Sequence, residues 1–181
     1  MSIFITSDPH FNHNNIIKFC NRPFGNIDEM NEVLIQNWNN IVKDNDEIYI
    51  LGDVSLGSSK NTLKILEKLN GIKYLIRGNH EKSILSNAEC RNHFEWIKDY
   101  FELKYDNKYF MLFHYAMRVW NKSHHGSIHL YGHSHDSLDK GGEYNGLSMD
   151  VGMDSAYRIL GEYRPFKIEE IIEIMNKRKD I

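Results

Sequence analysis

SIFITSDPH, residues 2–10, joins a short apolar run to an aspartate and a histidine. The run has the β-branched and aromatic composition of a buried strand, and the polar residues that follow are typical of a strand exit. The same arrangement returns in DEIYILGD (46–53) and in IKYLIRGNH (72–80), where apolar runs end on Gly-Asp and on Gly-Asn-His. The fold and the function that we expect both follow from these repeated strand exits.

Short apolar runs and amphipathic helical patterns alternate along the chain, which is typical of a layered α/β domain. We expect strands at residues 2–7, 46–51, 72–76, 97–104, 108–113, 127–131 and 146–151, and helices at 26–42, 59–69, 81–95 and 167–178. Asn26 followed by Glu29 predicts a capping box at the start of the first helix. No repeat or low-complexity linker interrupts the pattern, so we expect one domain over residues 1–181.

The bulk composition is that of an ordinary globular protein, with 41% apolar and 26% charged residues among 181. A net charge of −3 gives no general attraction to nucleic acid or to an anionic membrane. Cys20 and Cys90 form no CxxC pair, which excludes a zinc ribbon and a thioredoxin-like motif. The N-terminus lacks the pattern of a signal peptide, so we expect a cytoplasmic protein with no membrane partner. The oligomeric state stays open.

Five expected strands are followed by Asp, Asn or His. The side chains concerned are Asp8, His10, Asp53, Asn79, His114, His133 and His135. Because the carboxyl ends of strands in open α/β sheets meet at one edge, we expect these groups to lie together. Buried carboxylates and other acceptors at that density are stable only when a cation compensates them.

The number and type of these groups predict two divalent metal ions. Seven donors exceed what one tetrahedral ion uses, and Asp53 is placed to bridge two ions. The set contains nitrogen and oxygen ligands but no thiolate, which favours Mn²⁺, with Fe, Zn or Ni as alternatives. A two-metal site of this kind stabilises the attacking and leaving oxygens during hydrolysis of a phosphoester.

The ordered motifs D-x-H (8–10), GD (52–53), GNHE (78–81), His114 and GHSH (132–135) resemble the calcineurin-like metallophosphoesterase superfamily. The resemblance implies an α/β fold of two mixed sheets packed face to face with helices outside, a four-layer αββα sandwich. It also implies a division of the metal ligands. Asp8, His10 and His135 would bind one ion, Asn79, His114 and His133 the other, and Asp53 both.

The resemblance further implies that His80 contacts the scissile phosphate and acts as the acid for the leaving oxygen. Asp53 or Glu81 would hold its tautomer. Arg118 and Arg22 are the candidate phosphate contacts, because a guanidinium binds phosphate in a bidentate manner. We count Asp53 and Arg118 with His80 among the catalytic residues.

Further polar residues fall outside the proposed division of metal ligands or have a second expected role. Asn79 and His13 are further candidates for substrate contact, although His13 equally fits the start of a helix. We expect His124 and His125 on the surface and His129 in a structural role inside a strand. Asp150 and Asp154 follow another strand, so we expect them to support the site.

The expected activity is hydrolysis of a small phosphodiester, of nucleotidic type, by a hydroxide that bridges the two metal ions. A phosphomonoesterase or protein phosphatase of the same fold is the alternative. A non-catalytic metal-binding scaffold is a third interpretation, but family members of that kind typically lose His80 or several ligands, all of which are present here. A nuclease acting on long polymers would need a basic stripe, and the sequence has no such footprint.

Overall fold

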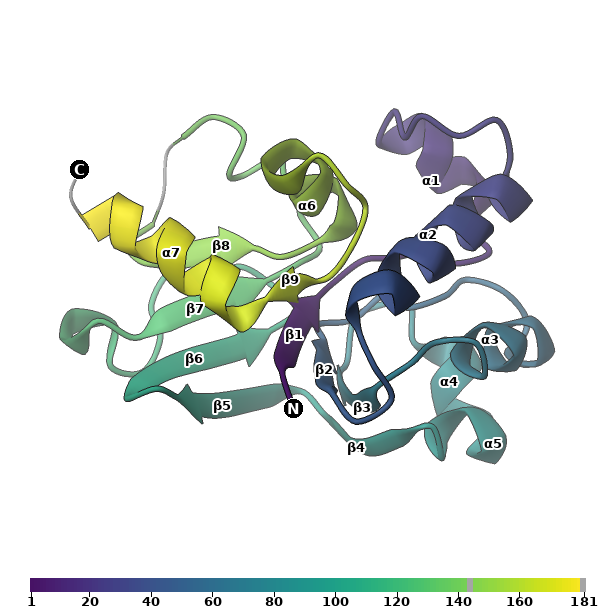
Figure 1. Ribbon diagram of the computed structural model, residues 1–181, viewed down its shortest axis with the longest axis horizontal. Helices are drawn as coiled ribbons and strands as arrows, with labels where there is room; N and C mark the ends of the chain where they lie inside the picture. Colours follow the sequence, from purple (N-terminus) through teal and green to yellow (C-terminus); the bar gives the residue numbers. More distant parts are fainter. Residues whose placement is uncertain (143–144, 180–181) are drawn as a thin grey trace.

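The computed structural model describes residues 1–142 and 145–179, and two β-sheets lie at its centre (Figure 1). The first sheet has the strand order β4-β3-β2-β1-β9. Its strands are β1 (Ile3–Thr6), β2 (Glu47–Ile50), β3 (Ile72–Ile76), β4 (Phe94–Lys98) and β9 (Phe166–Lys167). Strands β1 to β4 run parallel, and β9 runs antiparallel to β1.

The second sheet has the order β5-β6-β7-β8. Its strands are β5 (Tyr100–Tyr105), β6 (Lys108–Phe113), β7 (Ile128–Tyr131) and β8 (Ser148–Asp150). The β5–β6 pair is antiparallel, whereas β7 is parallel to both of its neighbours. The expected α/β architecture of two mixed sheets with flanking helices is therefore confirmed.

Alternating side chains of the first sheet serve two cores, as expected for strands covered on both faces. Phe4, Ile48, Ile50 and Leu75 pack with helices α2 (Ile27–Ile41) and α3 (Ser59–Leu66). Their neighbours Ile5, Tyr49, Leu51 and Ile76 pack instead with the second sheet and with helices α6 (Met153–Leu160) and α7 (Ile168–Lys179). No helix in the described ranges is both long and apolar enough to cross a membrane.

Helix α2 begins and ends close to where the sequence predicts. The side chain of Asn26 accepts a hydrogen bond from the Glu29 backbone N–H at 2.9 Å, which caps the helix. The Glu29 carboxylate accepts from the backbone N–H of Gly25, so the reciprocal bond of a strict capping box is made one residue earlier. Trp38 is fully buried on the inner face and donates its indole N–H to the Asn70 carbonyl at 3.0 Å.

Two expected elements between residues 81 and 104 are wrong. The single helix at 81–95 is two short helices, α4 (Lys82–Leu85) and α5 (Ala88–Arg91), followed by the start of β4. The single strand at 97–104 is the end of β4 and the start of β5, which belong to different sheets. Only Asp99 separates the two strands, so the sequence does not show where one ends and the next begins. Trp96 and Phe101, on either side of the crossing, pack against each other in one core with ring centroids 4.8 Å apart.

Three short elements lack a sequence signal strong enough to predict them: helices α1 (Asn14–Phe19) and α6, and strand β9. The residues that precede the two helices, His13 and Gly152, make no side-chain cap. Strand β9 has only two residues, too few to show an alternation. Tertiary packing, rather than local propensity, therefore defines these elements.

Lys73 provides a test of the packing on β3, because its side chain is buried and its ammonium donates to the Gly71 carbonyl at 3.0 Å. Burial lowers the pKa of Lys73 to about 8, although the negative charge of Asp44 raises it in part. Below pH 8 the buried ammonium is charged and destabilises the folded state. This destabilisation decreases as pH rises from about 8 towards the ordinary lysine pKa, because the ammonium loses its proton first in the folded state. We expect Lys73→Met to raise the free energy of unfolding at pH 7 by on the order of 2–3 kcal/mol.

Urea unfolding of both proteins at pH 7 and pH 10 measures this difference. The advantage of Lys73→Met should shrink at pH 10, since the wild-type lysine is then neutral in the folded state. An advantage that is the same at both pH values would contradict the assignment of a buried, titrating ammonium.

Candidate metal centre and active site

The two sheets meet at the carboxyl ends of β1, β2, β6 and β7, and this junction positions the site. The loop after β1 runs beside the loop after β2, with the Asp8 N–H donating to the Gly52 carbonyl and the His10 N–H to the Asp53 carbonyl, each at 3.1 Å. Ser7 forms an isolated bridge to Gly152, which follows β8 of the other sheet. The strand exits predicted from the sequence are therefore neighbours in space.

A first group of three side chains could hold a metal ion: Asp8, His10 and His135. The Asp8 Oδ1 atom lies 3.4 Å from His10 Nε2 and 3.9 Å from His135 Nε2. Asp8 Oδ1 and His10 Nε2 are both buried and have no hydrogen-bond partner in the described structure. Buried polar atoms without partners are costly, and a cation between them would compensate both.

A second group consists of Asp53, His114 and His133, with Asn79 beside it. His114 is fully buried, and its Nδ1 lies 2.7 Å from the Leu51 carbonyl, so the proton sits on Nδ1. The other ring nitrogen, Nε2, faces Asn79 Oδ1 at 3.0 Å and Asp53 Oδ1 at 3.8 Å. One nitrogen and two oxygen atoms that converge in this way match the donor set of a bound divalent cation.

Asp53 joins the two groups through its two carboxylate oxygens. Oδ2 lies 3.7 Å from His10 Nε2 in the first group, and Oδ1 faces His114 Nε2 in the second. The His80 backbone N–H donates to Oδ1 at 2.9 Å and fixes the orientation of the carboxylate. The donor set therefore fits two divalent ions that share Asp53.

Supporting residues hold the candidate ligands in position. Asp154 Oδ2 lies 2.9 Å from His135 Nδ1, which leaves His135 Nε2 free to face Asp8. This carboxylate–histidine arrangement is the usual support of a histidine metal ligand. Asp8 is held in turn through Oδ2, which accepts from the Ser7 hydroxyl at 2.6 Å and from the His133 backbone N–H at 2.8 Å.

Arg22 is part of this support, and its expected role as a phosphate contact does not fit its position. Its guanidinium is buried and donates to both oxygens of Asp154, at 2.8 and 2.9 Å. It also donates to the backbone carbonyls of Pro9 and Asp8 and to the sulfur of Met30. All of its donors are thereby engaged inside the protein, and none faces a substrate.

The backbone at several candidate ligands is held in the left-handed region. Positive φ values occur at Asp8, His10, Asp53, His133 and His135, between 47° and 64°. Non-glycine residues adopt this region at a cost of roughly 1–3 kcal/mol each, and they cluster at functional sites. Gly132 is required beside them, because a Cβ there would collide with Ser7 Oγ and Asp8 Oδ2.

The charges in the site perturb neighbouring acids and histidines. Burial and the charge of Asp53 raise the pKa of Glu81 to about 8, and burial with the charge of Asp8 raises the pKa of Asp150 to about 7. Burial alone would lower the pKa of His135, but its hydrogen bond to Asp154 and the nearby Asp8 raise it to about 10. The closely placed carboxylates therefore raise the pKa values of Glu81 and Asp150, and a bound cation would relieve this repulsion.

His80 has the exposure expected of a residue that meets substrate. Its side chain is 44% exposed, and its Nε2 lies 3.9 Å from Asp53 Oδ2. Glu81 does not hold the His80 tautomer. It is buried, and its Oε1 accepts from the Val54 backbone N–H at 3.2 Å, so that it fixes the loop that carries Asp53.

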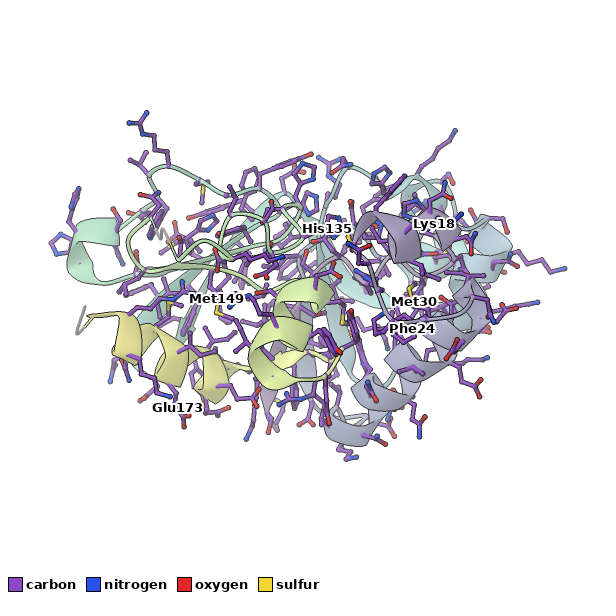
Figure 2. The ribbon with its side chains drawn as sticks, turned by 90° about the horizontal axis from the view of Figure 1, so that it is seen from above. Lys18, Phe24, Met30, His135, Met149 and Glu173 are labelled. Atoms are coloured by element: carbon purple, nitrogen blue, oxygen red, sulfur yellow. The ribbon has the colours of Figure 1, made fainter. Side chains whose placement is uncertain are left out.

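A cavity of about 710 Å³ opens above these groups. It is lined by His10, His13, Ile16, Phe19, Cys20, Asn21, Asp53, Leu56, Asn79, His80, His133, Ser134, His135, Ser137 and Lys140. Figure 2 labels His135 near helix α1, which forms one wall. His13 Nδ1 lies 3.4 Å from His10 Nδ1, so His13 both lines the cavity and orients a candidate ligand.

The sequence did not single out Phe19, Leu56, Ser134 or Lys140 as cavity residues. Lys140 brings a cation to the cavity lining and lies five residues after His135. No local motif marks these positions, because they reach the cavity only through the folding of the 133–142 loop and helix α1. The only feature of the sequence that could have indicated these cavity residues is their closeness along the chain to candidate ligands and cavity residues such as His13, Asp53 and His135.

Arg118 does not line this cavity. It is exposed and borders a separate hollow with Tyr131, Leu138 and Asn145, so the structure gives no support to its expected phosphate contact. His124 and His125 are exposed, as expected. His129 is buried in β7, where Nδ1 lies 2.9 Å from the Met111 carbonyl, in agreement with a structural role.

Comparison with known proteins decides the family. The sequence model described as calcineurin-like phosphoesterase matches residues 1–170. The chain belongs to this family. The chain is also 36% identical over 180 residues to the uncharacterized protein MJ1445 of Methanocaldococcus jannaschii, an alignment that covers 98% of this chain and 93% of the relative.

Two further similarities are more limited. The gene 66 protein of Mycobacterium phage L5 is 33% identical over 81 residues, which cover 43% of this phosphoesterase and 39% of the phage protein. The crystal structure of AQ665 from Aquifex aeolicus, a protein of unknown function, aligns with a TM-score of 0.73 and 24% identity, over 96% of this chain and 98% of the other. That structure supports the fold.

Replacement of Asp53 tests whether two metal ions share this carboxylate. In Asp53→Asn one oxygen becomes an amide with no negative charge, so we expect at least one ion per chain to be lost. Elemental analysis of protein reconstituted with Mn²⁺ measures the stoichiometry. Asp99→Asn is the control, because Asp99 is an exposed carboxylate paired with Arg77 away from the site. Equal metal content in both variants would contradict the shared role of Asp53.

Replacement of Arg22 tests its structural role. We expect Arg22→Met to lower the free energy of unfolding by on the order of 3–5 kcal/mol, because the largely buried Asp154 then loses its guanidinium partner and keeps only His135. Urea unfolding at neutral pH measures the loss. Unchanged stability together with a weaker affinity for substrate would instead restore Arg22 as a phosphate contact.

Proposed function

We propose that this chain is a dinuclear metal-dependent phosphoesterase that hydrolyses a small phosphodiester of nucleotidic type. Membership of the family and the candidate metal centre support a phosphoester hydrolase. The observation that carries the finer proposal is the position of Asp53, whose two oxygens face the two ligand groups. Mn²⁺ is the metal that we propose, since the ligands are nitrogen and oxygen donors without thiolate.

The residues that would hold the ions are those of the two groups. Asp8, His10 and His135 would bind one ion, Asn79, His114 and His133 the other, and Asp53 both. When bound, divalent ions supply Lewis-acid stabilisation of phosphoryl oxygens and lower the pKa of coordinated water. The chain contributes the fixed positions of these ligands, through Asp154 on His135 and the Leu51 carbonyl on His114.

His80 is the residue that we assign to the leaving group. Its imidazole lies at the cavity beside Asp53, half exposed, and its backbone is fixed through its N–H on the Asp53 carboxylate. From that place it would donate a proton to the departing ester oxygen, as a general acid does. Lys140 adds positive charge on the cavity wall, where the phosphate of a substrate would be attracted.

A diester fits the cavity better than a phosphate group alone. The volume of about 710 Å³ lies within the range of pockets that hold a small organic ligand. The cavity wall combines apolar residues of α1 with polar residues of the 133–140 segment, so there is room for an organic group beside the phosphate. Phosphomonoester hydrolysis stays as the second outcome of the assay below.

The test is hydrolysis of bis-p-nitrophenyl phosphate and of p-nitrophenyl phosphate by the Mn²⁺-loaded protein, before and after chelation. We expect diester hydrolysis that chelation abolishes. His80→Ala should reduce turnover by roughly 10²- to 10⁴-fold while metal content stays near wild type, because His80 donates a proton and holds no ion. His124→Ala is the control, since His124 is exposed and does not line the cavity.

Three results would contradict parts of this proposal. Faster hydrolysis of the monoester than of the diester would replace the diesterase with a phosphatase. Absence of metal-dependent hydrolysis of any ester would favour a binding scaffold. Loss of metal from His80→Ala would show that His80 is a ligand.

A further inference from the structure

One wall of the active-site cavity is apolar and comes from helix α1 and the residues near it. Ile16, Phe19 and Cys20 lie on this wall, and Leu56 from the loop after β2 joins them. The cavity is also lined by the hydroxyl groups of Ser134 and Ser137 and by Lys140. The cavity therefore has an apolar wall suited to an organic group and polar groups suited to an anion.

Helix α1 is anchored, so this wall is part of the fold. Ile16 is 2% exposed in the core beneath the helix. The Cys20 N–H donates to the Ile16 carbonyl at 2.9 Å, and the Arg22 N–H donates to the Ile17 carbonyl at the same distance. The buried guanidinium of Arg22 then holds the end of this segment to Asp154.

Phe19 is 71% exposed although the helix that carries it is anchored. Its ring contacts His13, with centroids 6.2 Å apart and planes at 73°, so the edge of one ring meets the face of the other. His13 contacts His10 in turn, with centroids 5.3 Å apart. Phe19 is thus connected to a candidate metal ligand through two successive ring contacts.

Asn21 provides a polar group on the same wall. It lines the cavity two residues after Phe19, in the left-handed conformation with φ of 51°. It is exposed, and its side-chain amide has no hydrogen-bond partner within the residues that the structure describes. An aromatic face next to a free amide is a combination that binds the face and the edge of a planar heteroaromatic ring.

We propose that Phe19 and Asn21 form a subsite for the nucleobase of the substrate, with Phe19 stacking on the ring and Asn21 hydrogen-bonding to its edge. This inference rests on the proposed phosphoesterase function and names the group that the α1 wall selects. A nucleobase is favoured over an alkyl chain because the wall is short, carries one exposed aromatic ring and includes an amide. Phe19 and Asn21 then determine specificity and take no part in the chemical step.

The test compares the binding of adenosine 5′-monophosphate and ribose 5-phosphate, which differ only by the base. Isothermal titration calorimetry is performed on the Mn²⁺-loaded protein in the His80→Ala background, so that turnover does not disturb the measurement. We expect adenosine 5′-monophosphate to bind roughly tenfold more tightly or better, the usual contribution of one stacked base. Phenyl phosphate distinguishes stacking alone from stacking with hydrogen bonding at the ring edge.

Variants at the two positions assign the effect. Phe19→Ala should remove most of the preference for adenosine 5′-monophosphate and leave ribose 5-phosphate binding unchanged, whereas Phe19→Tyr should keep it. Asn21→Gly removes the amide while it suits the left-handed backbone, and should weaken adenosine 5′-monophosphate but not phenyl phosphate. Val119→Ala is the control, because Val119 is an apolar residue with 77% exposure that does not line the cavity.

Equal affinity of the His80→Ala protein for the two ligands, together with diester hydrolysis by the protein that retains His80, would overturn the base subsite and leave the proposed function standing. An equal loss of both ligands in Phe19→Ala would also overturn it, since Phe19 would then act through the fold. Failure of the protein to bind either ligand or to hydrolyse any ester would remove the proposed function together with this inference.

Discussion

Carboxylate oxygens and imidazole nitrogens held close together at the junction of the two sheets are the constraint on which the structure depends. Asp8 Oδ1 and His10 Nε2 are buried without hydrogen-bond partners, and His114 Nε2 faces the oxygens of Asn79 and Asp53. Such contacts are unfavourable in a protein that binds no cation, and favourable around divalent ions. The fold nevertheless holds these atoms close together, and this closeness is the main physical argument for a metal centre.

The architecture brings this arrangement about by joining the ends of two sheets. Strand exits of one sheet supply Asp8, Asp53 and Asn79, and those of the other supply His114 and His133. Backbone bonds between the loops, the left-handed conformations and the glycine at 132 allow the side chains to approach closely. Apolar cores on both faces of the first sheet stabilise the junction, which offsets the strain at the site.

Much of this arrangement was predictable from the sequence, because strands and metal-affine residues have strong local patterns. The exits at Asp53 and His80 are each preceded by an apolar run, and the order of the motifs indicates the family. The crossing between β4 and β5 was not predictable, since only Asp99 separates the two strands and no glycine or proline marks the change of sheet. Arg22 was misread for a similar reason: a guanidinium suits phosphate and buried carboxylate equally, and only its contact with Asp154 distinguishes them.

The most direct measurement of the central claim is anomalous X-ray diffraction from crystals of the Mn²⁺-loaded protein. We expect two anomalous peaks, one on either side of the Asp53 carboxylate, the first within bonding distance of Asp8, His10 and His135 and the second of Asn79, His114 and His133. A single peak, or peaks that do not contact Asp53, would contradict it.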